Sequence, residues 1–136
     1  MDTSFKAVVF NSEHKVLLGT NPRSEWELLG GRADPEDRGP EDTIRRELFE
    51  EAGLDIVLGS IVDIWYYDIA GEGRVAVASY LAEPASDTPL TASHEHGKLA
   101  YFAVDQIDDL QLPGRYKTTI RRAQQLILSQ REKGIR

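Results

Sequence analysis

An acid-rich segment, residues 46–54 (RELFEEAGL), constrains the fold most, because it predicts the last turns of a helix that begins near Pro40. Proline suits the first helical position, where an N–H would have no partner, and Gly53 suits the left-handed residue that ends many helices. The negative end of the helix dipole favours Lys or Arg in the last turn. Glu50 and Glu51 stand there instead, at a cost of about 0.3–1 kcal/mol each.

The positions of Glu47 and Glu51 indicate what compensates this cost. Because they are four residues apart, their like charges share one helix face and repel. A solvated acidic surface is one explanation, and Arg46 could pair with Glu50 for about 0.3 kcal/mol. The other explanation is a bound divalent cation, since departures from local rules are typical of functional sites.

A short apolar run, residues 26–31 (WELLGG), precedes a polar loop at residues 32–39 and favours the cation. Two glycines after a strand-like segment allow positive φ and a close approach of the backbone to a ligand. A backbone carbonyl there could complete an oxygen cage with the helix carboxylates. Mg²⁺ prefers such hard oxygen ligands, together with waters and substrate phosphates. The order of glycine turn, polar loop and acidic helix therefore predicts a magnesium site.

Residues 31–54 resemble the Nudix box, the signature of the Nudix hydrolases. The second half matches the pattern Arg-Glu-apolar-x-Glu-Glu-x-Gly-apolar at every specified position. In the first half, Asp37 stands where the family has Glu, and eight residues rather than seven separate it from Arg46. Counting from Gly30 puts Glu36 at the acidic position but lengthens the gap further. We interpret the segment as a variant box with a one-residue insertion, which is inexpensive in a loop.

The resemblance implies the ligands and the chemistry of the site. Mg²⁺, with Mn²⁺ as a substitute, would be held by Glu47 and Glu51, with Glu50 within reach of a second ion. The Gly31 carbonyl, or that of its neighbouring glycine, would add a further ligand. Arg46 would orient these carboxylates rather than clamp the substrate. The reaction implied is hydrolysis of the pyrophosphate bond in a nucleoside diphosphate linked to another group.

The general base is either a box glutamate, for which Glu50 is the candidate, or an acid in a later loop. That loop is residues 93–97 (SHEHG), where Glu95 is the candidate base or simply an exposed loop residue. Proton transfer by a positioned side chain typically contributes about 10²–10⁴-fold to the rate. Two histidines flank Glu95, but without further ligands they do not predict a zinc site.

Four residues are candidate contacts for the substrate. Arg23 and Arg32 could meet phosphates or be solvated, and Trp26 could belong to a pocket wall or to the core. Tyr67 shares one strand face with Trp65, and stacking of a base on such a ring is worth about 1–3 kcal/mol. Core packing of these aromatics is the alternative. The sequence does not choose among nucleoside triphosphates, sugar nucleotides, dinucleoside polyphosphates and coenzyme A derivatives.

Patterns on both sides of the acidic helix predict the fold. A polar hairpin turn at residues 11–14 joins the first two strands, and a Gly-Glu-Gly turn joins the next two. Together with the resemblance, the order of elements predicts one domain over residues 1–136, a Nudix-like α/β/α sandwich around a mixed β-sheet. The predicted strands are residues 5–10, 16–20, 56–69, 74–83 and 99–104, and a terminal helix with one apolar face is predicted at residues 115–133.

The amino-acid composition limits the kinds of partner that we expect for this protein. A net charge of −7 disfavours a nucleic-acid polymer, whereas small phosphorylated nucleotides remain compatible because a bound metal inverts the local field. No apolar stretch approaches 18 residues and the first residues do not resemble a signal peptide, so we expect a cytoplasmic protein without a membrane partner. The absence of cysteine excludes disulfides and thiolate zinc sites. An exposed strand such as residues 61–67 could support a homodimer.

Two other functions are compatible with a Nudix-like chain. A non-catalytic nucleotide sensor would be expected to lack box carboxylates, and all three are present. An isomerase of isoprenoid diphosphates with this fold would use a cysteine, which the chain lacks. Hydrolysis is therefore the leading hypothesis.

Overall fold

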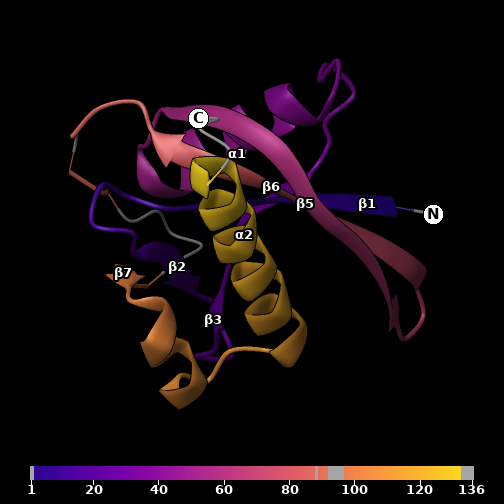
Figure 1. Cartoon of the computed structure of the whole chain (residues 1–136). Helices are drawn as coiled ribbons and strands as arrows, with labels where there is room; N and C mark the ends of the chain where they lie inside the picture. Colours follow the sequence, from indigo (N-terminus) through magenta and orange to yellow (C-terminus); the bar gives the residue numbers. More distant parts are fainter. Residues whose placement is uncertain (1, 88, 92–96, 133–136) are drawn as a thin grey trace.

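The computed structural model describes residues 2–87, 89–91 and 97–132, and Figure 1 shows the path of the chain. Within these residues no helix is both long and apolar enough to cross a bilayer. The elements in chain order are β1 (Asp2–Val9), β2 (Val16–Thr20), β3 (Trp26–Glu27), β4 (Leu29–Arg32), α1 (Pro40–Ala52), β5 (Ile56–Ile69), β6 (Gly73–Pro84), β7 (Leu99–Phe102), the 3₁₀ helix η1 (Val104–Asp109) and α2 (Gly114–Glu132).

The strands form two sheets. The larger one has the order β4-β1-β6-β5 and is mixed, because β1 runs parallel to β6 while the β1–β4 and β5–β6 pairs are antiparallel. The smaller one has the order β3-β2-β7 and is antiparallel. In the larger sheet, β4 and β5 are therefore the edge strands.

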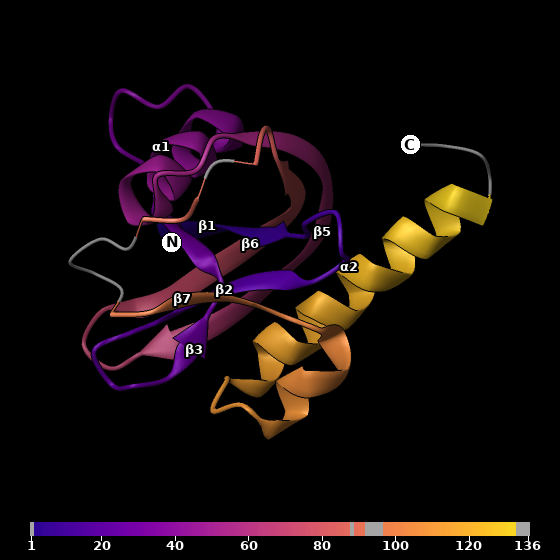
Figure 2. The same cartoon turned by 90° about the vertical axis from the view of Figure 1, so that its left-hand side faces the viewer.

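The two helices cover opposite sides of the strands, as Figure 2 shows. Alternate strand residues face opposite sides, so Ala7 and Val9 pack in the cluster that contains Ile44 of α1. Val8, between them, packs in the cluster that contains Ile120 of α2. This arrangement confirms the predicted α/β/α sandwich around a mixed sheet.

Residues 26–31, a single apolar run in the sequence, are divided between the two sheets. Trp26 pairs with Thr20 of β2, whereas Leu29 pairs with Ala7 of β1. Leu28 and Leu29 are both buried, but they belong to the α2-side and α1-side clusters respectively. The division leaves the glycine pair on β4, an edge strand of the larger sheet.

The predicted turn at residues 11–14 is present, but the prediction that the strands on either side of it pair as a hairpin is wrong. The Asn11 side-chain oxygen accepts hydrogen bonds from the backbone N–H groups of Glu13 and Lys15, both at 3.0 Å. Beyond the turn, the two strands share one isolated bridge, between Phe10 and Val16, and then enter different sheets. Strand β1 instead forms a complete parallel ladder with β6, and β2 pairs with β3 and β7. The predicted β5–β6 hairpin is confirmed.

Other boundaries agree closely with the expectations. Strand β1 begins at Asp2, earlier than predicted, and the strand predicted at residues 99–104 ends at Phe102 because η1 begins at Val104. Helix α2 buries Ile120 and Ala123 completely, which confirms that one apolar face packs on the strands.

Candidate active site

Helix α1 has the ends that its sequence predicts. Pro40 is its first residue, and Gly53 follows it with a φ of 63°, donating its N–H to the carbonyl oxygen of Phe49 at 2.8 Å. Leu48 and Ala52 are fully buried and fix the rotation of the helix. This rotation turns Glu51 inward, where only 3% of the residue is exposed. Packing of the apolar face thus brings a carboxylate into the interior.

The two glycines of β4 lie against two glutamate side chains of α1. The N–H of Gly30 donates a hydrogen bond of 3.0 Å to Oε2 of Glu51. A Cβ atom added to Gly31 would lie 2.6 Å from Oε1 of Glu47, so the missing side chain makes room for that carboxylate. Gly30 has a φ of 143°, which other residues rarely adopt. Gly31 is therefore required by its contact with Glu47, whereas Gly30 is required by its φ and by the close approach of the β1 backbone.

Glu47 and Glu51 make a partly buried, like-charged pair. The side chain of Glu47 is 14% exposed. Burial raises the pKa of the Glu47 carboxyl, and the charge of Glu51 raises it further, whereas Arg46 opposes both effects. Glu50, on another side of the helix, is 56% exposed. Two carboxylates held together away from water are compensated best by a cation.

Arg46 lies at the centre of a charged network. Its guanidinium is 3.0 Å from Oε1 of Glu47 and 3.6 Å from Oε2 of Glu50, and its Nη2 is 2.8 Å from Oδ2 of Asp37. Nε is also 3.3 Å from Oδ2 of Asp34. These contacts suit the predicted role of an orienting partner, and that role remains a prediction.

Asp37 is held more firmly than its exposed loop suggests. Besides Arg46, its Oδ2 accepts hydrogen bonds from Oγ1 of Thr43 at 2.9 Å and from the N–H of Asp34 at 2.8 Å. The bond from Arg46 and the others together lower the pKa of Asp37 to about 2. Sequence reasoning missed Asp34 and Thr43. Thr43 is completely buried in the first turn of α1, and the sequence alone does not show this burial.

The oxygen donors at this site suit a hard divalent cation, of which Mg²⁺ is the predicted one. Across the residues that the structure describes, no group of three or more His, Cys, Asp or Glu side chains is arranged to hold a metal ion. Glu47, Glu51 and a β4 carbonyl would supply only part of an octahedron, which is the usual situation for Mg²⁺ because waters and substrate phosphates complete it. The oxygens are hard, negatively charged and partly buried, as that ion requires.

The remaining candidate catalytic residue, Glu95, lies outside the described residues, and so do the neighbouring His94 and His96.

The candidate arginines each have an acidic partner. Arg23 is 3.1 Å from Oε1 of Glu25. Arg32 is 3.3 Å from Oδ2 of Asp2 and 3.6 Å from Oε1 of Glu72. Their roles as phosphate ligands remain predictions.

The candidate aromatics have partners within the fold. Trp26 packs edge-on against Phe102, with ring centroids 4.8 Å apart, and it also lines an open groove of about 510 Å³ with Lys98. Tyr67 is 38% exposed and lies 5.6 Å from the ring of Trp65. Trp26 packs against the α2-side core cluster, whereas Tyr67 is exposed, and a role in binding remains a prediction for each.

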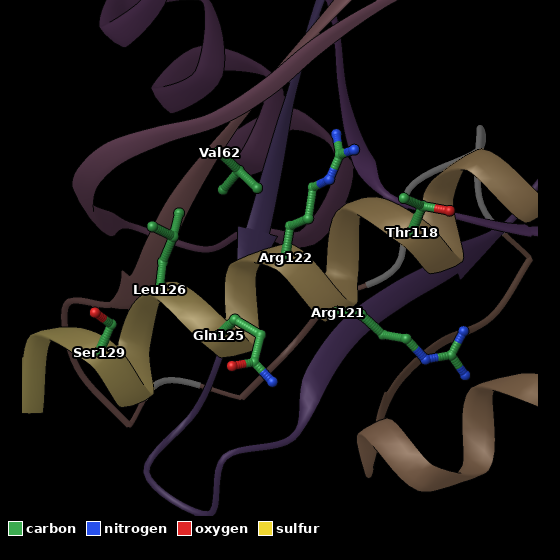
Figure 3. Close-up of a pocket in the computed structure, with 7 residues that line it drawn as sticks. All are labelled: Val62, Thr118, Arg121, Arg122, Gln125, Leu126 and Ser129. Atoms are coloured by element: carbon green, nitrogen blue, oxygen red, sulfur yellow. The ribbon is translucent and has the colours of Figure 1, made fainter. Parts of the chain in front are cut away.

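A larger groove of about 620 Å³ lies along α2, on the side of the strands opposite α1. Val62 of β5 and six residues of α2 line it, and Figure 3 shows Arg121 and Arg122 pointing in different directions. Arg121 is 2.7 Å from Oδ2 of Asp108, and Arg122 is 3.3 Å from Oδ2 of Asp63. The groove shares no residue with the glycine–glutamate site.

Comparison with known proteins identifies the family. The sequence model of the NUDIX domain matches residues 2–123. The chain therefore belongs to the Nudix family, and the class that its fold and site define is the Nudix pyrophosphohydrolases, which act on phosphorus-containing anhydrides. This confirms the resemblance and the enzyme class expected from the box. Members of the family generally use divalent metal ions.

Solved structures show the same fold at low sequence identity. The MutT protein from Methanosarcina mazei Go1 is 21% identical, with a TM-score of 0.78, and the match covers 91% of this chain and 93% of that one. An Ap4A hydrolase from C. elegans is 17% identical, with a TM-score of 0.82 and coverage of 95% and 99%. An ADP-ribose pyrophosphatase from Streptococcus suis is 22% identical, with a TM-score of 0.70 and coverage of 88% for each. No curated protein sequence matches the chain significantly.

Proposed function

We propose that this protein is a Mg²⁺-dependent hydrolase that cleaves the pyrophosphate bond of a nucleoside diphosphate linked to another group. The observation that carries the proposal is the buried pair of Glu47 and Glu51, held against the glycines of β4. Arg46 offsets the repulsion between them only in part, because the pKa of Glu47 stays raised, and a metal cation at a strand edge could also be shared with a diphosphate. We take residues 1–136 as one domain that contains the whole site.

Each side chain of the site has its own proposed role in the reaction. Glu47 and Glu51 would hold the ion with the Gly31 carbonyl, while Arg46 keeps Glu47 and Glu50 in position. A bound divalent cation supplies charge neutralisation and a lowered pKa for water. Glu50 or Glu95 takes the proton from the attacking water as its oxygen bonds to phosphorus. The P–O bond of the anhydride then breaks, and the second phosphate leaves.

The proposed substrate class rests on the substrates after which two proteins of similar structure are named. The similar structures include an Ap4A hydrolase and an ADP-ribose pyrophosphatase, and each of these named substrates contains a nucleoside joined to another group through phosphates. We propose the same general class for this chain, with a nucleoside triphosphate or a sugar nucleotide as substrate. Arg23, Arg32, Trp26 and Tyr67 are the proposed contacts.

A non-catalytic nucleotide-binding domain is the second candidate function. It is less well supported, because a sensor has no need to keep Glu47, Glu50 and Glu51 together. Binding of a nucleotide without turnover would favour it over hydrolysis.

The decisive experiment is a substrate panel. The purified protein is incubated in MgCl₂ with a nucleoside triphosphate, ADP-ribose, a dinucleoside polyphosphate, a nucleotide sugar and coenzyme A. Parallel samples contain MnCl₂ or EDTA. We expect turnover of at least one compound, retained in Mn²⁺ and abolished in EDTA. Reaction in ¹⁸O-labelled water identifies the attacked phosphorus, and equal rates in EDTA and MgCl₂ would contradict the proposal.

Partners and location complete the proposal. We propose a homodimer through β5, which is an edge strand with Ile61 and Ile64 exposed by 44% and 55%. Sedimentation equilibrium of the wild type and of Ile64→Glu tests this. We propose a cytoplasmic location and no membrane or nucleic-acid partner, which cell fractionation and binding assays test.

A further inference from the structure

A row of polar residues crosses the larger sheet and ends at the glycine pair. Asp63 of β5 is the register partner of Ser79 of β6, and Ser79 is also the partner of Lys6 of β1. Lys6 in turn lies opposite Gly30 of β4. Four adjacent strands therefore place Asp63, Ser79, Lys6 and Gly30 side by side, although they are far apart in sequence.

The side chains of this row are buried on the α2 side of the sheet. Lys6 alternates with Ala7 and shares a face with Val8, which belongs to the α2-side cluster. Lys6 is 8% exposed and Ser79 is 0% exposed. A lysine is almost never buried unless it is paired, so its surroundings need an explanation.

The polar side chains of this row do not satisfy one another's hydrogen-bonding groups. Oδ2 of Asp63 accepts a hydrogen bond from Thr119 at 2.9 Å, but its Oδ1 is sealed from solvent without a partner, as is Oγ of Ser79. Among the residues that the structure describes, the amine of Lys6 forms no ion pair or hydrogen bond. A structural network would link Lys6 through the Ser79 hydroxyl to Asp63, and that link is missing. The amine of Lys6 is not one of these sealed atoms, so it keeps some contact with solvent.

The place of Lys6 beside the edge strand indicates which ligand it suits. Directly opposite partners in an antiparallel pair have Cα atoms about 4.5–5.5 Å apart. The backbone of Gly30 therefore separates Lys6 from Glu51, which accepts the Gly30 N–H from the outer side of the edge. A diphosphate bound at this edge would present one phosphate to the carboxylate site and extend another toward the lysine.

We propose that the amine of Lys6 binds an anionic oxygen of the substrate's diphosphate, as a positioning residue for the phosphate that the carboxylate site does not hold. This inference rests on the proposed function and deepens it. A buried ammonium is unfavourable without an anion and favourable with one. Lys6 should therefore reduce the stability of the free protein while strengthening substrate binding.

Substitution of Lys6 by methionine separates this role from a structural one. Methionine keeps the volume and removes the charge. We expect Lys6→Met to raise KM for the best substrate of the panel by about tenfold or more, with kcat changed less than about threefold. The Tm of Lys6→Met should be equal to or above that of the wild type. Lys15→Met, in the exposed turn after β1, is the matched control and should change neither quantity.

Calorimetry with ADP in EDTA gives a readout that needs no turnover. We expect ADP to bind Lys6→Met about tenfold or more weakly than the wild type, and Lys6→Arg to restore part of the affinity. Equal affinities, no measurable binding by either protein, or a lower Tm for Lys6→Met would overturn the proposal. If the wild type has no hydrolase activity, only the proposed function is overturned. The role of Lys6 is still tested, because the measurement of ADP affinity needs no turnover.

Discussion

Oδ2 of Asp37 lies 2.8 Å from Nη2 of Arg46, and this contact joins the loop of the variant box to helix α1. The extra residue of the box falls in the loop between the two, where Gly39 is extended and leads directly into α1. The loop absorbs the insertion, and the shorter acid still meets the arginine. Arg46 can therefore bridge the loop and the helix glutamates despite the altered spacing.

The Asp37–Arg46 pair should make stability depend on pH. The pKa of Asp37 is lowered from 3.8 to about 2 in the folded protein, so the ionised carboxyl stabilises the fold above about pH 4. That contribution is lost as the pH falls through about 2. We expect Asp37→Asn to lower Tm at pH 7 and to match the wild type near pH 2 in thermal melts. Asp68→Asn, which breaks the exposed pair with Arg74, is the control and should have little effect at either pH.

The two glycines of β4 should respond differently to alanine. Gly31→Ala places a Cβ 2.6 Å from the end of the flexible Glu47 side chain, which can move aside, so the fold should survive with weaker Mg²⁺ binding and lower activity. Gly30→Ala would bring a Cβ to 2.0 Å from the carbonyl oxygen of Phe5 at a φ of 143°. Backbone strain alone should cost about 1–3 kcal/mol there. Thermal melts and Mg²⁺ titrations of both variants test this, and equal Tm losses would contradict it.

Glu51→Gln should abolish most activity without unfolding the protein. The amide oxygen of glutamine can still accept the Gly30 N–H, so the contact survives while the charge is lost. We expect turnover to fall by about 10²-fold or more, with a circular dichroism spectrum like that of the wild type. Glu41→Gln, in the exposed first turn of the same helix, should retain full activity. A rate for Glu51→Gln near that of the wild type would refute its role as a ligand.

Magnesium should stabilise the wild type but not Glu47→Gln. Binding to the native state alone adds about 2.7 kcal/mol at an ion concentration of a hundred times Kd. We expect the Tm of the wild type to rise with MgCl₂ and fall back with EDTA. In EDTA, Glu47→Gln should be at least as stable as the wild type, because the repulsion from Glu51 is removed. Glu13→Gln, in an exposed turn, should respond to MgCl₂ as the wild type does.

The pH dependence of turnover decides the general base. If Glu95 accepts the proton, Glu95→Gln should lower kcat by about 10²–10⁴-fold and remove the acidic limb of the pH–rate profile. The same measurement on Glu50→Gln tests the alternative. An acidic limb that is unmoved in Glu95→Gln assigns the base elsewhere.

Local sequence signals were sufficient to predict helix α1, which carries the carboxylates, and the β5–β6 hairpin. The ends of α1 follow from Pro40 and Gly53, because caps and the helix dipole act within one turn. The β5–β6 hairpin follows from its glycine turn in the same way. Both kinds of feature depend on residues close together in the chain, so the acidic helix and its place after the glycine pair were predictable.

By itself, the sequence determined the family, the acidic helix and the alternation of strands around it. Only the tertiary structure decided that residues 26–31 divide between two sheets, that Arg46 reaches Asp37, and that Lys6 is buried opposite Gly30. These features depend on register between strands that are distant in sequence, and a shift of one residue would turn every side chain to the other face. Local propensity cannot specify such a register, because it results from packing both faces of the sheet at once.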